Sequence, residues 1–395
     1  MKSNWKIAIV LFAVVLMMNL VSPALVRAKA LNPDLQLKID AHAAVLLEPS
    51  SGEIVFAKNP DLQLPPASVT KLMVMLLVLE AVDRGDVKLT DVVAASPEAC
   101  KMGGSQIWLE PGEQMTVSEL LKAVCIVSAN DASYALAEHI AGSEENFISL
   151  MNKRAKQLSL KSTVYVNTTG LDPDGGGAGN MTSAGDMALL AREVIKHPTV
   201  FRWTGVWIDS LRGGKSFLRN TNKLVRFYRG CDGLKTGYTA KAGFCLVASA
   251  KRDGVRLVAV VMNSPTTDAR SKDISKLLNY GFSKFKAVQI YQGGETVSRV
   301  KVFRGTQPLV AAVVPRELAA VLHREARGNV VKTIQLERVV NAPVRKGQKI
   351  GQVLLSIDGK SCGQVDLVAA ADIKRASVLQ IWWEIFRRTI RIGVS

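Results

Sequence analysis

Cysteine and histidine are scarce in this chain. Its 395 residues include five cysteines and four histidines, with no C-x-x-C pair and no clustered histidines. An odd number of scattered cysteines argues against a disulfide framework, and the positions of cysteine and histidine form no zinc-type ligand set. The sequence therefore predicts no metal site, no disulfide framework and no cofactor.

Acidic residues are outnumbered by basic ones. The chain has 51 lysines and arginines against 34 acidic residues, a formal net charge of +17. Such an excess can serve nucleic-acid binding, but no basic-aromatic motif accompanies it, so no nucleic-acid partner is expected. An anionic cell wall or membrane surface is the expected counterpart. The 48% hydrophobic and 22% charged residues argue against disorder.

The apolar run near the N-terminus is too short to span a bilayer comfortably, which takes about 20 residues. Lys2 and Lys6 precede this run at 7–18, and Ala28-Lys29-Ala30 offers an A-x-A cleavage site. This pattern predicts a secretory signal peptide over 1–30, with an uncleaved N-terminal anchor as the alternative. The mature protein is then exported, to the outer face of the cytoplasmic membrane or the cell-wall side.

A Ser-x-x-Lys motif is the most informative feature that is present. Ser68-Val69-Thr70-Lys71 lies between a proline-rich approach at 64–67 and an apolar run at 72–79. Residues three apart in a helix share a face, about 5–6 Å apart at Cβ. A desolvated, neutral lysine amine can take the proton of the serine, which is a poor nucleophile by itself. The prolines place Ser68 near a helix N-terminus, where free N–H groups favour negative charge.

Two further segments argue against a chance match. Ser128-Ala129-Asn130 follows the apolar stretch 120–127, and Lys235-Thr236-Gly237 precedes the strand-like segment 243–250. The ordered set S-x-x-K, S-x-N and K-T-G occurs in penicillin-binding proteins and class A β-lactamases.

The chemistry explains these residue types. Ser68 would attack a carbonyl and Lys71 would receive its proton. Ser128 and Lys235 could relay a proton to the leaving amine and hold positive charge near a substrate carboxylate. Asn130 offers an amide for the substrate backbone, and Gly237 lets a strand edge approach closely.

With these motifs the chain resembles a specific family, the low-molecular-mass penicillin-binding proteins that act as serine D-Ala-D-Ala carboxypeptidases (peptidase family S11). The resemblance runs from about Ala41 to Ala376. It includes the segments 44–56, 168–172, 181–188 and 241–244 as well as the three motifs. It implies an α/β (α+β) penicillin-recognising fold, β-lactam inhibition and a peptidoglycan stem peptide as substrate.

The resemblance implies roles for two more residues, from their positions relative to the motifs. Arg270 falls where the family places an arginine near the carboxylate of the terminal D-alanine, and its bidentate fork suits that anion. Tyr238 follows Gly237 where the second N–H of the family's oxyanion hole lies, the first coming from Ser68. Only the backbone of Tyr238 is needed, and its side chain departs from the His or Phe often seen there.

The pattern predicts two domains after the signal peptide. The first, over 40–286, opens with a hairpin, continues through a mostly helical centre with a capping box at 116–119 and a helix within 143–160, and returns as strands over 234–262. A helix is predicted over 274–286. From 288 to 376 short alternating segments and glycine turns predict a small β-rich domain.

The C-terminal residues 377–395 predict a membrane-interface helix. At about 100° per residue the polar side chains fall within one narrow arc and apolar ones, with two tryptophans, fill most of the rest. Such a helix lies in the bilayer interface, although docking on the protein's own surface is the alternative. The polar arc holds Gln380, Glu384, Arg387, Arg388 and Arg391.

Other readings of the same motifs stay open. A β-lactamase shares all three, although no Glu-x-x-Leu-Asn lies between Asn130 and Lys235 to hold a deacylating water. A D,D-endopeptidase or transpeptidase differs only in its acceptor and scissile site. A non-catalytic wall-binding homologue is a different class, and the intact motif residues weigh against it.

Deleting 377–395 should release the signal-cleaved protein from membranes, because the deletion removes the predicted interfacial face. Fractionation of cells that express the full-length and truncated forms measures this. A truncated form that still sediments with membranes would contradict the prediction.

Overall fold

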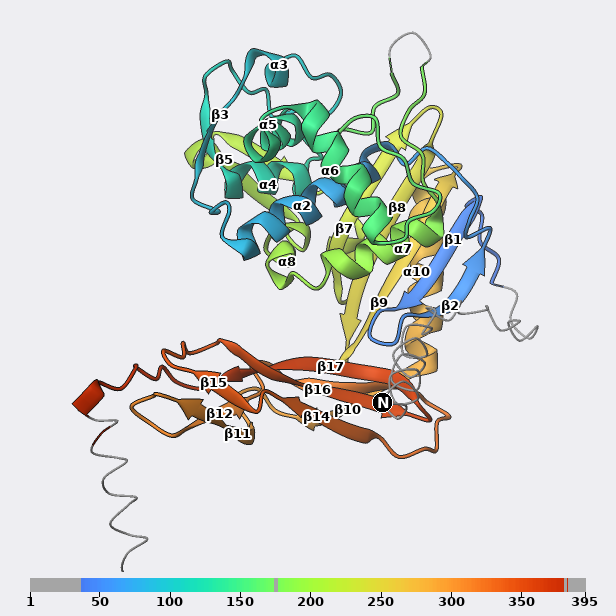
Figure 1. Cartoon of the computed structure of the whole chain (residues 1–395). Coiled ribbons are helices and arrows are strands. Elements are labelled where there is room, and N and C mark those ends of the chain that lie inside the picture. Colours follow the sequence, from blue (N-terminus) through green and yellow to red (C-terminus); the bar gives the residue numbers. More distant parts are fainter. Residues whose placement is uncertain (1–36, 174–176, 380–381, 383–395) are drawn as a thin grey trace, which may run out of the picture. The chain divides into compact units, whose positions relative to one another are not determined.

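The computed structural model describes residues 37–173, 177–379 and 382 (Figure 1). The predicted signal peptide (1–30) and most of the predicted terminal helix (377–395) lie outside these residues. In the part of the chain that is described, no helix is both long and apolar enough to cross a membrane.

An antiparallel sheet of five strands supports the first domain. Its order is β2-β1-β9-β8-β7, so strands from the two ends of the domain lie side by side and β7 forms one edge. The strands are β1 (Ala43–Glu48), β2 (Glu53–Lys58), β7 (Cys231–Thr239), β8 (Gly243–Arg252) and β9 (Val255–Ser264).

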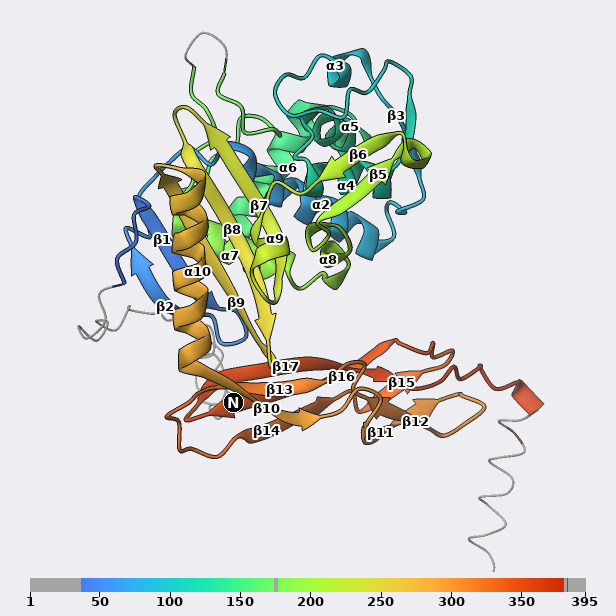
Figure 2. The ribbon, with the colours of Figure 1, turned by 180° about the vertical axis from the view of Figure 1, so that it is seen from behind.

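Both faces of this sheet are buried. In β1, Ala43, Val45 and Leu47 belong to one apolar core, while Ala44 and Leu46 belong to a second core on the opposite face. Helices cover both faces (Figures 1 and 2), and alternate side chains of a strand point to opposite faces, so the inner strands β1, β8 and β9 have long, nearly apolar runs. The helices α2 (Lys71–Arg84) and α7 (Ala184–Val194) pack on the first face and α10 (Thr267–Lys284) on the second.

A helical region follows the first hairpin and carries the second motif. The predicted capping box is confirmed, because the side chain of Thr116 accepts the Glu119 N–H and the Glu119 carboxylate accepts the Thr116 N–H. This box starts α4 (Val117–Ile126), which leads to the Ser128–Asn130 segment. The helix predicted within 143–160 is α6 (Glu144–Gln157), and α5 (Asn130–Ala141) precedes it.

Short elements complete the first domain. Two small hairpins, β3 with β4 and β5 with β6, flank the helical region. The remaining elements are the 3₁₀ turns η1 (Ala67–Thr70), η3 (Pro198–Val200) and η4 (Arg212–Gly214), the helices α3 (Pro97–Cys100), α8 (Phe201–Thr204) and α9 (Leu224–Phe227), and the strands β3 (Val92–Ala94), β4 (Gln114–Thr116), β5 (Ile208–Leu211) and β6 (Ser216–Arg219).

The helix predicted over 274–286 has different bounds. Thr266 caps α10 by accepting the Ala269 N–H, so the helix begins at Thr267 and ends at Lys284. Its first turn is polar, and apolar spacing alone therefore missed it. Phe285 and Lys286 already belong to β10 (Phe285–Tyr291).

The segment after α10 consists of strands around a separate apolar core. β10 pairs with β13 (Leu318–His323), and six strands form a sheet of order β14-β16-β17-β12-β11-β15. The predicted pairs Val300/Val302, Val353/Leu355 and Val365/Leu367 all lie in this core, whereas Ile334 is 44% exposed. The six strands are β11 (Thr296–Phe303), β12 (Leu309–Val313), β14 (Val331–Leu336), β15 (Val339–Asn341), β16 (Lys349–Ile357) and β17 (Lys360–Ala369).

Thr116→Ala should lower the free energy of unfolding by about 1 kcal/mol, because it removes the hydroxyl that caps α4. Urea denaturation measures the change. Ser149→Ala, at an exposed position inside α6, is the control and should leave stability unchanged or slightly higher, since alanine favours helix. An unaltered midpoint for Thr116→Ala would contradict the role of the cap.

Candidate active site

Ser68 and Lys71 meet at the junction of η1 and α2. Ser68 lies inside the 3₁₀ turn and Lys71 is the first residue of α2, so the predicted helix start is a tighter turn followed by the helix. The Lys71 Nζ lies 3.1 Å from Ser68 Oγ. The i, i+3 spacing thus places the amine beside the hydroxyl, as expected from the sequence.

The Lys71 amine is completely buried and has two other partners. It donates to Asn130 Oδ1 at 2.6 Å and to the Thr169 carbonyl at 2.6 Å. Burial and the charge of Lys235 hold the pKa of Lys71 well below its ordinary value, with Asp131 acting in the opposite direction. A neutral amine has two N–H donors and one lone pair. Its donors match Asn130 and Thr169, which leaves the lone pair for the Ser68 hydroxyl.

Ser128 lies between α4 and α5 with a left-handed backbone, φ 68°. Few residues other than glycine adopt this conformation, and such residues cluster at functional sites. The Ser128 hydroxyl is buried and has no hydrogen-bond partner among the described residues. It is therefore free to exchange a proton with a bound substrate.

Asn130 has a role beyond the predicted one. Its oxygen accepts from Lys71 and its Nδ2 donates to the Gly103 carbonyl at 2.6 Å, while binding of its amide to the substrate backbone stays a prediction. One N–H of the amide is left for a substrate. Asn130 chiefly positions the lysine amine and ties the 103–113 segment to the site.

The K-T-G motif lies in β7. Lys235 is buried and donates to the Thr236 carbonyl at 2.8 Å, and Thr236 Oγ1 donates to Thr221 Oγ1 at 2.7 Å. Burial, and secondarily the charge of Arg270, lowers the pKa of Lys235 to about 7. Near neutral pH this amine exchanges its proton readily and is stabilised as a cation by any bound anion.

Gly237 allows β7 to contact the nucleophile's turn. A Cβ at this position would lie 2.7 Å from the Pro66 carbonyl oxygen and 3.1 Å from the Ser68 nitrogen. Any larger residue would push the strand away from Ser68. The neighbouring Tyr238 has an exposed side chain that stacks on Phe244 at 4.3 Å between ring centroids.

Arg270 lies in the first turn of α10 and is 6% exposed. It donates to the Cys245 carbonyl at 3.4 Å, its Nε has no partner among the described residues, and its guanidinium lies 5.8 Å from the Phe244 ring centroid. Cys245 pairs with Gly237 across the sheet. Arg270 is thus a buried charge behind the third motif, with donor capacity left for an anion.

Sequence reasoning missed the role of Thr169 and Gly170. The Thr169 carbonyl accepts from Lys71, and a Cβ on Gly170 would lie 1.9 Å from the Ala67 carbonyl oxygen. Gly170 has φ 80°, which also favours glycine. The Thr-Thr-Gly segment was noted for its resemblance, but a backbone carbonyl leaves no signature in residue types.

Asp131 was also missed. It is fully buried and accepts the N–H groups of Ile107 and Leu109 at 3.1–3.2 Å. The carboxylate therefore anchors the 103–113 segment at the start of α5. A carboxylate directly after the S-x-N motif was the only sequence signal for this role.

Comparison with known proteins identifies this arrangement. Residues 28–266 match the family described as D-alanyl-D-alanine carboxypeptidase, and residues 285–375 match the C-terminal domain of penicillin-binding protein 5. The chain is 42% identical to D-alanyl-D-alanine carboxypeptidase DacF of Bacillus subtilis over 348 residues, which covers 87% of this chain and 88% of that protein. It is 33% identical to DacC of Escherichia coli, with 88% and 87% covered.

Solved structures agree with the fold. Penicillin-binding protein 5 of Haemophilus influenzae is 32% identical with a TM-score of 0.62, covering 86% of this chain and 98% of that one. A protein of Streptococcus pneumoniae described as a peptidoglycan synthesis regulatory factor (PBP3) is 29% identical with a TM-score of 0.65, covering 85% of this chain and 100% of that one. Fold and site define a penicillin-recognising serine hydrolase, which confirms the predicted fold class. The chain belongs to the D-alanyl-D-alanine carboxypeptidase family.

The contribution of Lys235 to folding should become more favourable as pH rises from about 7 toward 10. Folded Lys235 loses its proton near pH 7, whereas the unfolded residue keeps it up to about 10.5, so the unfolded state binds more protons in this window. Urea denaturation across this range should show a smaller pH dependence for Lys235→Met than for the wild type. Lys161→Met, at an exposed position, should follow the wild type. Parallel curves for wild type and Lys235→Met would contradict the burial of this charge.

Proposed function

We propose that the protein removes the terminal D-alanine from peptidoglycan stem pentapeptides through an acyl-enzyme on Ser68. The observation that carries the proposal is the Ser68 hydroxyl 3.1 Å from a buried amine whose other partners, Asn130 and Thr169, are both acceptors. Membership of the D-alanyl-D-alanine carboxypeptidase family supports the choice of substrate.

Acylation begins with proton transfer from Ser68 to Lys71. The serine oxygen attacks the carbonyl carbon between the two D-alanines, and the N–H groups of Ser68 and Tyr238 stabilise the oxyanion. Lys235 and Arg270 hold the terminal carboxylate. The C–N bond then breaks, and the proton that Lys71 took from Ser68 passes through Ser128 and Lys235 to the departing amine, which returns Lys71 to its neutral form.

Deacylation repeats these steps with water. Lys71 takes a proton from water, the resulting hydroxide attacks the ester, and Ser68 leaves with a proton as the trimmed peptide is released. A β-lactam would acylate the same serine, but its ring-opened product stays attached and hinders the attack of water. The chain has no Glu-x-x-Leu-Asn between Asn130 and Lys235 to hold a deacylating water. This absence favours a penicillin adduct that is released slowly, and it argues against β-lactamase activity.

The segments at the two ends of the chain support an extracytoplasmic location. A signal peptide over 1–30 would export the protein, and an amphipathic helix over 377–395 would hold it at the outer face of the cytoplasmic membrane. The β-rich domain of 288–376 carries none of the three motifs and would serve as a spacer or partner module that holds the first domain off the membrane. The net charge of +17 suits an anionic wall or membrane surface.

The test is mass spectrometry of a diacetylated tripeptide ending in D-Ala-D-Ala after incubation with the protein. The expected product has lost one alanine, and labelled penicillin should bind covalently. Ser68→Ala should abolish both, whereas Ser50→Ala, at a half-buried serine outside the three motifs, should retain both. Full activity or covalent penicillin binding in Ser68→Ala would overturn the assignment of the nucleophile.

A further inference from the structure

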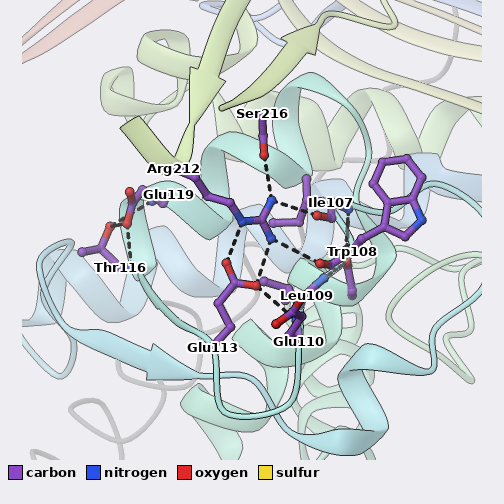
Figure 3. Close-up of polar contacts among 10 residues, drawn as sticks. Ile107, Trp108, Leu109, Glu110, Glu113, Thr116, Glu119, Arg212 and Ser216 are labelled. Atoms are coloured by element: carbon purple, nitrogen blue, oxygen red, sulfur yellow. Dashed lines mark hydrogen bonds and ion pairs between the residues drawn. The ribbon is translucent and has the colours of Figure 1, made fainter. Parts of the chain in front are cut away.

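A pocket of about 410 Å³ lies between the 103–113 segment and the β5–β6 hairpin. Figure 3 shows that the Arg212 guanidinium is the hub of the polar contacts there and that the indole of Trp108 points away from the ion pair. The volume lies in the range of small-molecule sites. The pocket is lined by Ile107, Trp108, Glu110, Glu113, Arg212 and Ser216.

Arg212 has no donor left for a ligand. Its Nε and one Nη donate to both oxygens of Glu113 at 2.7 and 2.9 Å. The remaining donors reach the carbonyls of Ile107 and Trp108 at 3.0 and 3.3 Å and Ser216 Oγ at 2.9 Å. A guanidinium has five N–H groups, and all five are used here. Arg212 therefore fastens the hairpin to the 103–113 segment and is not available to bind an anion.

Trp108 is held rigidly with its ring in solvent. The side chain is 76% exposed, and the backbone has φ 53°, a left-handed conformation that is rare for a bulky residue. Its neighbours Ile107 and Leu109 donate their N–H groups to buried Asp131, and its carbonyl accepts from Arg212. A strained backbone fixed from both sides presents a flat apolar face beside the pocket.

After Arg212 is accounted for, two polar side chains of the pocket can still bind a ligand: Glu110 as an acceptor and Ser216 as a donor. Glu110 is exposed, and its carboxylate forms no ion pair among the described residues. The Ser216 oxygen accepts from Arg212, so its hydroxyl proton is left to donate. A free carboxylate and a saturated guanidinium disfavour an anionic ligand. An aromatic face with single hydroxyl-type partners suits an uncharged, polyhydroxylated ring.

The pocket is joined to the active site through Asn130 on one side and the K-T-G strand on the other. The Asn130 N–H donates to the Ser105 carbonyl at 2.7 Å, and Trp108 is three residues further along. The hairpin leads to Thr221, which accepts from Thr236 in the third motif. The four residues on the amino side of the scissile bond extend about 13–14 Å when fully stretched.

We propose that this pocket, with Trp108 as its platform, binds the amino-sugar ring of the glycan strand that carries the stem peptide. The inference rests on the proposed carboxypeptidase function and adds a second contact to the substrate. Gly103 and Ser105 of the 103–113 segment contact Asn130 at the active site, so this segment is the surface that the amino side of a bound stem peptide would meet. The enzyme would then prefer peptides still attached to sugar.

The test compares kcat/KM for a disaccharide-pentapeptide and for the free pentapeptide of the same sequence, using the full-length protein. The wild type should favour the disaccharide form by about tenfold, the factor that covering about 60 Å² of apolar ring surface provides. Trp108→Ala should lose this preference and keep its rate on the free pentapeptide, and Trp108→Phe should retain part of it. Phe227→Ala removes an equally exposed ring elsewhere and should keep the preference.

The outcomes separate the two proposals. Equal rates of the wild type on both substrates would overturn the sugar site. An equal loss of rate on both substrates in Trp108→Ala would also overturn it, and would point instead to a site for a peptide side chain. A preference that survives Trp108→Ala would overturn it as well. Failure of the wild type on the diacetylated tripeptide would count against the carboxypeptidase function itself, and thermal unfolding of each variant shows whether it is folded.

Discussion

The buried amine of Lys71 is the interaction on which the rest of the site depends. Its three partners come from η1, the start of α5 and the 168–170 segment, so one nitrogen brings together parts of the chain up to 101 residues apart. A buried ammonium is costly without strong partners, and desolvation shifts it toward the neutral amine. The same burial that makes Lys71 a base also requires these segments to close around it.

Two glycines make this closure sterically possible. Gly170 lies against the Ala67 carbonyl and Gly237 against the Pro66 carbonyl, so the turn that carries Ser68 is contacted by backbone on two sides. Side chains at either position would separate the nucleophile from its base or from the strand. The precision of the site therefore comes from backbone contact, while the two apolar cores on either face of the sheet keep β7 in place.

The sequence predicted the reactive residues and identified the family, because the types and order of the motif residues carry the chemistry directly. It also predicted the capping box and the β-rich second domain from local patterns. It did not predict that Asn130 holds Lys71 through its side-chain oxygen, or that the Thr169 carbonyl and Asp131 complete the site. These roles depend on backbone atoms and long-range contacts that no local pattern encodes. The start of α10 was missed for a related reason, since its polar first turn is set by the Thr266 cap and not by apolar spacing.

The position of β7 at the edge of the five-stranded sheet has a consequence for selectivity. An edge strand has main-chain groups that no neighbouring strand uses, so an extended peptide can join it by β-augmentation. Recognition of this kind depends on main-chain hydrogen bonds to the peptide and only weakly on the peptide's side chains. Stem peptides with varied side chains could therefore bind along β7. A small rigid molecule that has the shape and hydrogen-bonding groups of that backbone can therefore bind in place of the substrate.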